Sequence, residues 1–162
     1  MPYNGKEEYV PLEVEDHIME TQEMGRVLVE ATIENLRDAW DAERGMLAAN
    51  DVRRVTVREA LVDTGATSLS LPAGLIGQLG LKKRSEKRVT TSSGDGTAAV
   101  YDPVRLTIQG RDCVVEVVEL PDSVPPLIGQ VPLEMLDFVV DPRSHRLIGN
   151  PAHGGEHVLE LY

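Results

Sequence analysis

The chain has 162 residues, 41% of them hydrophobic, which suits one globular domain with a single core. Its formal net charge is -11, and an acidic surface repels nucleic-acid backbones and anionic membranes, so neither is expected as a partner. Aromatic residues make up only 4%, too few to provide platforms on which unpaired bases stack.

The first 23 residues stand apart as an acidic N-terminal arm, and residues 24–162 are expected to form the folded domain. The arm holds seven acidic residues and one lysine, a net charge of 1 - 7 = -6. This composition favours a solvated, disordered tail. The alternative is an arm that packs on the domain or occupies its cleft before activation. Because the chain begins without a signal-peptide pattern and has no apolar run of membrane-spanning length, we expect a cytoplasmic protein.

The segment after the arm alternates apolar and polar side chains over residues 26–34. This period of two is typical of a half-buried strand. The residues that share its apolar face are Val27, Val29, Ala31 and Ile33.

A polar stretch, residues 37–50, separates the first strand from the second. It predicts an elaborated hairpin loop with a short helical turn at 36–43, and the alternative is a cap over a cleft. The second strand, 52–62, runs directly into Asp63.

The middle of the chain predicts short strands separated by turns. Residues 70–74 resemble a turn, and 75–81 form a short apolar piece. Turn-forming residues at 92–96 mark the tip of a hairpin, and 109–111 mark another tight turn. The strands expected here cover residues 87–92, 97–109 and 111–120.

The best helix pattern follows Pro125 and Pro126. Its apolar positions are Ile128, Val131, Leu133, Met135 and Leu136. A strand that stops at Asp141-Pro142, a returning strand at 146–148 and a last strand at 157–162 complete the chain. Many short strands and one good helix predict an all-β domain, a small barrel.

Cys113 is the one cysteine in the sequence, which excludes an intrachain disulfide. It begins the apolar run Cys113–Leu120. We therefore expect a buried strand thiol and not a reactive one.

The residues that carry chemistry are Asp63-Thr64-Gly65, which follow the apolar end of the second strand. Gly65 permits a tight bend, and the Thr64 hydroxyl can bond to nearby backbone. Such a bend can hold the Asp63 carboxylate in one fixed direction. The simpler interpretation is an Asx-type turn at the end of a strand.

The wider pattern resembles the retroviral-type (retropepsin-like) aspartic proteases, in a bacterial-style, single-domain form. Asp63-Thr-Gly-Ala-Thr67 follows an apolar strand, a flap-like hairpin follows, and Leu127-Ile-Gly129 opens a helix. The resemblance covers residues 25–162. It implies a small closed barrel with one short C-terminal helix, endopeptidase activity, and no metal or cofactor.

The resemblance also implies roles for particular residues. Asp63 is the expected catalytic carboxylate, and Thr64 is expected to bond across a dimer axis beside Gly65. The terminal strand, 157–162, matches the one that such proteins use in a dimer sheet. The expected substrate-binding residues are Ala66 and Thr67 on the floor of the cleft, Gly94, Asp95 and Gly96 at the flap tip, and Leu127, Ile128 and Gly129 beside the catalytic loop.

The number of Asp-Thr-Gly triplets predicts a homodimer that acts on peptides or proteins. An aspartic peptidase needs two carboxylates around one water, and this chain has one triplet and is too short for two lobes. A twofold axis would bring two copies of Asp63 together. Two carboxylates this close share one proton, as is known for aspartic proteases.

Two positions depart from the retroviral pattern. Members of that group carry an acidic residue after Asp-Thr-Gly-Ala and an Arg after the Gly of the second motif, which form an internal ion pair. Here the first position is Thr67 or Ser68 and the second is Gln130. A different brace is therefore expected.

Two rival interpretations remain. His153-Gly-Gly-Glu-His157 matches the His-x-x-Glu-His string of one zinc-peptidase group, but its two glycines disfavour the helix which that site needs. The second rival is a retropepsin-like dimerisation or peptide-binding module that does not cut. An intact Asp63-Thr64-Gly65 argues against the second.

Overall fold

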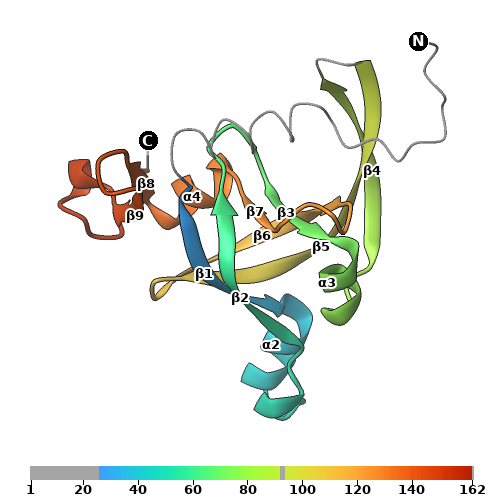
Figure 1. The fold of residues 1–162 in the computed structure, drawn as a ribbon. Helices are drawn as coiled ribbons and strands as arrows, with labels where there is room; N and C mark the ends of the chain where they lie inside the picture. The colour runs from blue at the N-terminus through green and yellow to red at the C-terminus, as the bar shows by residue number, and fades with distance from the viewer. Residues whose placement is uncertain (1–25, 92–93, 162) are drawn as a thin grey trace.

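The computed structural model describes residues 26–91 and 94–161 (Figure 1). The predicted acidic arm, residues 1–23, and the hairpin positions Ser92 and Ser93 lie outside the described residues. The elements are β1 (Leu28–Asn35), α2 (Leu36–Glu43), η1 (Ala49–Asp51), β2 (Arg54–Val62), β3 (Leu69–Pro72), α3 (Ala73–Gln78), β4 (Lys83–Thr91), β5 (Gly94–Ile108), β6 (Arg111–Leu120), β7 (Leu127–Ile128), α4 (Gln130–Leu136), β8 (Phe138–Asp141), β9 (Arg146–Gly149) and η2 (Pro151–His153).

Most of the strands belong to one seven-stranded sheet in the order β1-β2-β7-β3-β6-β5-β4, and β1 also pairs with β5. Because β1 bonds to strands near both ends of this order, the sheet curls back on itself (Figure 1). Strands β8 and β9 form a separate two-stranded sheet. The predicted all-β class is confirmed.

Alternation along the first strand places its apolar face in the core as predicted. Val27, Val29, Ala31 and Ile33 are all buried, whereas Leu28 and Glu30 between them are exposed. The same hydrophobic cluster includes side chains of the sheet and of helices α3 and α4. The sheet and these two helices therefore share one core.

The local predictions were correct for several elements. The helical turn at 36–43 is α2, which begins where the Asn35 side chain accepts a hydrogen bond from Asp38 N–H. Strand 111–120 is β6, and the turn before it has positive φ at Gln109 (48°) and Gly110 (79°). Two successive positive φ angles are typical of a tight hairpin turn.

Other local predictions were wrong. Residues 70–74 are not a turn, because β3 runs through Pro72 and α3 starts at Ala73. Pro72 has no N–H to donate, but at the end of a strand and the start of a helix this group is not needed for a backbone hydrogen bond. Of the three α-helices in the described residues, α3 is therefore the one that was not predicted. Residues 157–161 form no strand in the single chain.

The insert between β1 and β2 is fixed by an ion pair between a largely buried Asp38 and a half-exposed Arg53. Asp38 accepts hydrogen bonds from the Arg53 side chain at 2.8 and 3.1 Å and from its backbone N–H at 3.1 Å. These bonds outweigh the effect of burial and lower the pKa of Asp38 below its ordinary value. No helix in the described part of the chain has the length and apolar character needed to cross a bilayer.

Truncating a core side chain should destabilise the fold far more than truncating an exposed one. Leu106 is fully buried in β5, so Leu106→Ala is expected to lower the free energy of unfolding by about 2–5 kcal/mol. Val114 on the neighbouring strand β6 is 42% exposed, so Val114→Ala should cost less than about 1 kcal/mol. Urea denaturation checks both values, and equal losses would contradict this placement of the core.

Cys113 should be unreactive in the native protein. It is buried, and burial raises the pKa of its thiol from 9.0 to about 11, which confirms the expected strand thiol. Alkylation by iodoacetamide at neutral pH should therefore be at least about 100-fold slower than in urea-unfolded protein, since thiolate is the reactive form. Similar rates in both states would contradict its burial.

Candidate active site

The Asp63 loop begins where β2 ends, and backbone contacts fix its first residue. Asp63 N–H donates to the Ile128 carbonyl at 3.0 Å, and Ala66 N–H donates to the Asp63 carbonyl at 3.1 Å. The Asp63 side chain accepts a bond from Gly65 N–H through Oδ1 at 3.0 Å. This is the Asx-type turn that the sequence allowed, and it points the carboxylate in one direction.

The second oxygen of Asp63 has no partner. The residue is only 3% exposed, and Oδ2 is buried without a hydrogen bond within the described residues. A buried carboxylate oxygen without a donor is costly and rare in native proteins. The loop therefore displays an unsatisfied acceptor at a buried position.

Strand β7 passes beneath this loop and joins its two sides. It pairs in parallel with β2, which enters the loop, and antiparallel with β3, which leaves it. The residues that follow continue the contact. Gly129, Gln130 and Val131 donate their N–H groups to the carbonyls of Ser68 (3.0 Å), Ala66 (2.8 Å) and Thr67 (2.9 Å). The first turn of α4 thus holds the loop in place.

Gly129 is required by a close approach and not by its backbone angles. Its φ is -84°, which any residue can adopt. A Cβ at this position would lie 2.6 Å from the Ser68 carbonyl oxygen and 2.7 Å from that of Ala66. Only glycine lets the chain pass this near to the Asp63 loop.

A cleft of about 690 Å³ opens above the loop. One wall is the loop and the start of β3, another is the hairpin of β4 and β5 that stands out from the sheet in Figure 1, and the third is the end of β6. The residues that line it are Asp63, Gly65–Ser68, Ser70, Lys83, Glu86–Thr90, Thr97–Val100 and Val118–Leu120.

The expected residues of the loop lie in or beside this cleft. Asp63, Gly65, Ala66 and Thr67 line it, and Thr64 is exposed next to them. The Ala66 carbonyl already accepts the bond from Gln130 N–H, which leaves one lone pair for a ligand.

The other expected residues lie elsewhere. Leu127, Ile128 and Gly129 are buried beneath the loop, beside it as expected but not on the surface of the cleft. Residues 94–96 are the first three residues of β5. They do not line the cleft. There Asp95 accepts a bond from the Thr90 hydroxyl at 3.1 Å.

The arms of the hairpin line the cleft, and sequence reasoning missed them. Residues 86–90 of β4 pair with residues 95–99 of β5. The part of these two arms that lines the cleft is 86–90 and 97–100. The long run of strand residues on each side of 92–96 was the signal, because a hairpin this long must extend far from its tip. Residues 37–50 do not line the cleft, which favours the elaborated loop over the cap.

The brace that replaces the retroviral ion pair is made of backbone. Gln130 uses its N–H for the Ala66 carbonyl, whereas its side chain bonds to Glu134 at 3.1 Å. This contact requires no charged side chain at Thr67 or Ser68, where the retroviral pattern has an acidic residue. The loop is therefore held without a buried ion pair at these positions.

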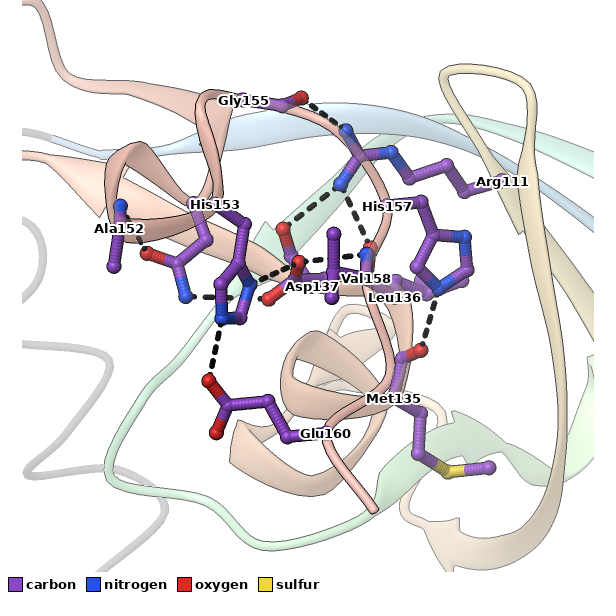
Figure 2. A network of polar contacts seen from close by, with 11 residues as sticks. Arg111, Met135, Leu136, Asp137, Ala152, His153, Gly155, His157, Val158 and Glu160 are labelled. Atoms are coloured by element: carbon purple, nitrogen blue, oxygen red, sulfur yellow. Dashed lines mark hydrogen bonds and ion pairs between the residues drawn. The ribbon is translucent and has the colours of Figure 1, made fainter.

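A second polar cluster surrounds Asp137 at the end of α4 (Figure 2). Its carboxylate contacts His153 Nδ1 at 2.6 Å, Asn150 Nδ2 at 3.2 Å and Val158 N–H at 3.1 Å. His153 Nε2 lies 2.9 Å from Glu160. Desolvation acts to raise the pKa of Asp137, but the bonds from His153, Val158 and Asn150 outweigh it and lower this pKa to about 2.

This arrangement does not fit the rival zinc site. His153 ends the short 3-10 helix η2, and both of its ring nitrogens already contact carboxylates. His157 lies outside any helix and contacts the Met135 carbonyl at 3.0 Å. The described residues contain no group of three or more side chains placed to hold a metal ion.

Fold and site together are those of the retropepsin-like class: a curled all-β sheet that presents one Asp-Thr-Gly loop held by a Gly-led helix. The family model described as gag-polyprotein putative aspartyl protease matches residues 51–140, from the last residue of η1 into β8. This match covers more than half of the chain, and the chain belongs to this family. No curated protein matches the sequence significantly.

Adding one methyl group at Gly129 should disturb the loop. Gly129→Ala forces its Cβ against two backbone carbonyls, so we expect a loss of about 1–3 kcal/mol or more in the free energy of unfolding. Gly77→Ala is the matched control, because its Cβ meets nothing within 4 Å and it lies in helix α3. The control should raise stability by up to about 1 kcal/mol. Equal effects in urea denaturation would show that the loop is not held by this approach.

Proposed function

We propose that this chain is an aspartic endopeptidase whose site is completed by a second copy, each copy supplying one Asp63. The observation that carries the proposal is the unpartnered Oδ2 of Asp63, buried at the floor of the cleft. A twofold axis beside the loop would bring the twin carboxylate to this oxygen. A proton shared between the two acids would then satisfy it.

The chemistry follows from the shared proton. The ionised member of the pair takes a proton from a water held between the two carboxylates. The protonated member donates to the carbonyl oxygen of the scissile peptide, and the water oxygen forms the new bond to carbon. The tetrahedral intermediate collapses when the amine leaves with a proton from the pair. In this proposal the exposed Thr64 bonds to its twin across the axis, and no metal takes part.

The cleft is suited to a peptide. It lies between the Asp63 loop and the β4–β5 hairpin, so a chain bound there passes directly over the carboxylate. The substrate class we infer is therefore an extended peptide or an exposed segment of a protein. The proposal keeps the cytoplasmic location expected from the sequence.

Replacing Asp63 tests the proposal. Asp63→Asn keeps the shape of the side chain but removes the shared proton, so cleavage of a peptide library should fall by at least about 10²–10⁴-fold. Assays over about pH 4–8 should also show wild-type activity falling at the alkaline end, where the pair loses its proton. Analytical ultracentrifugation should find both forms dimeric.

Three outcomes would count against this mechanism. Equal cutting by both forms would exclude Asp63 as the catalytic group. Cleavage by a strictly monomeric wild type would exclude the paired site. Peptide binding without cleavage in either form would favour the non-cutting module, which would use the same cleft.

A further inference from the structure

The wall of the cleft that β4 forms, which we call the β4 wall, is positively charged in a chain whose net charge is negative. Residues 82–88 contain five lysine and arginine residues and one glutamate, a net charge of 5 - 1 = +4, whereas the whole chain carries -11. Most of this segment belongs to β4 (Lys83–Thr91), the last strand in the order of the sheet (Figure 1). Charges of one sign that gather along a cleft determine its local potential, whatever the net charge of the protein.

The charges that line the cleft are not distributed evenly. Lys83 donates a hydrogen bond to Glu86, and this bond raises the pKa of Lys83 above its ordinary value. Glu119 lies near Lys83 and the Tyr101 hydroxyl, and Lys83 pairs with Tyr101 where the hairpin leaves the sheet. Acids and a cation therefore offset one another at this end of the cleft. Among the described lining residues, the remaining charged side chains are Asp63 on the floor and Lys87 and Arg88 on the β4 wall.

Lys87 and Arg88 make only long ion pairs, with acids that do not line the cleft. Lys87 Nζ lies 3.9 Å from the Glu116 carboxylate. The Arg88 guanidinium lies 3.8 Å from the Asp95 carboxylate. Both distances exceed those of hydrogen bonds, and all four side chains are at least 62% exposed. Because such pairs contribute little to stability, a carboxylate from a ligand can replace these partners at small cost.

The register between β4 and β5 directs Lys87 toward the cleft. Lys87 pairs with Ala98, and two residues earlier Ser85 pairs with Val100. Paired residues share a face of a sheet, as do alternate residues of one strand. Lys87 therefore lies on the same face as Val100, which is buried and lines the cleft. Its partner Ala98 has a small side chain, which leaves space beside Lys87 for a side chain of a ligand.

We propose that Lys87 and Arg88 determine specificity: they select peptides whose acidic side chain lies against the β4 wall while the peptide backbone passes over Asp63. A carboxylate accepts charge-assisted hydrogen bonds from ammonium and guanidinium groups, and these are stronger than bonds between neutral groups. A basic side chain at the same place is repelled by both cations, which adds to the discrimination. The inference rests on the proposed function, because it names the substrate class of that same cleft.

Selection from a random octapeptide library tests the preference separately from cleavage. Immobilised Asp63→Asn protein, which should bind peptides without cutting them, captures peptides that are then sequenced. After alignment, Asp and Glu should be enriched about 3–10-fold over the input at one position or more, the effect expected of two exposed ion pairs. The enrichment should disappear at about 1 M salt, which screens such charges. Equal recovery of acidic, neutral and basic peptides would overturn the proposal.

Variants of the β4 wall make this test specific. In the Asp63→Asn protein, Lys87→Gln combined with Arg88→Gln should remove the acidic enrichment. Lys87→Glu combined with Arg88→Glu should shift the enrichment to Lys and Arg, which a purely structural role of these residues does not predict. Lys82→Gln is the matched control for Lys87→Gln, because it removes one charge from the same segment but does not line the cleft. The proposal is wrong if the double Gln variant keeps the preference, or if Lys82→Gln loses as much of it as Lys87→Gln.

The outcomes separate this inference from the proposed peptidase activity. If acidic peptides are selected but the wild type cuts none of them, the peptidase mechanism is wrong and the preference stands. If the wild type cuts peptides without regard to acidic residues, the preference is wrong and the mechanism stands. A library that yields no bound peptide overturns both. In the active protein, Lys87→Gln should raise KM for an acidic substrate by about 2–5-fold with little change in kcat, since the contact is already made in the bound substrate.

Discussion

Three backbone hydrogen bonds from the first turn of α4 to the carbonyls of residues 66–68 are the contacts on which the site depends. They form only because residue 129 has no Cβ, which lets the two backbones approach. Below them, β7 pairs with the strand that enters the loop and with the strand that leaves it. The direction of the Asp63 carboxylate is thus set by main-chain hydrogen bonds, and glycine is required at residue 129.

The alternation of apolar and polar residues predicted several strands of the fold, because a strand with one buried face carries apolar side chains at every second position. The alternation of Val27, Val29, Ala31 and Ile33 corresponds to the buried face of β1 and of the residue before it. The turn at Gln109 and Gly110 was also predicted correctly, because few residue types accept the positive φ that it requires. The turn predicted at 70–74 was wrong because Ser70 and Leu71 are buried by tertiary packing, which a local propensity does not contain.

The Asp63 loop could also be predicted from the sequence, because Asp63-Thr64-Gly65 and Leu127-Ile128-Gly129 are short contiguous motifs. The sequence could not show that the second of these lies under the loop and out of the cleft. That distinction depends on the β2–β7–β3 pairing, which joins residues far apart in the chain. The walls of the cleft were missed because the long strands on each side of 92–96 indicate a hairpin, but not that residues 86–90 line the same cleft as the loop.

The double pairing of β1 has a consequence for the order in which the protein folds. Strand β1 meets β5 at Thr32 and Thr107, a separation of 107 - 32 = 75 residues. Residues Leu61 and Leu127 of β2 and β7 are 127 - 61 = 66 apart. Contacts of this kind close large loops at an entropic cost, whereas the β4–β5 hairpin joins neighbours. We therefore expect the hairpin to form early and the Asp63 loop to be completed late, so that partly folded chains carry no assembled site.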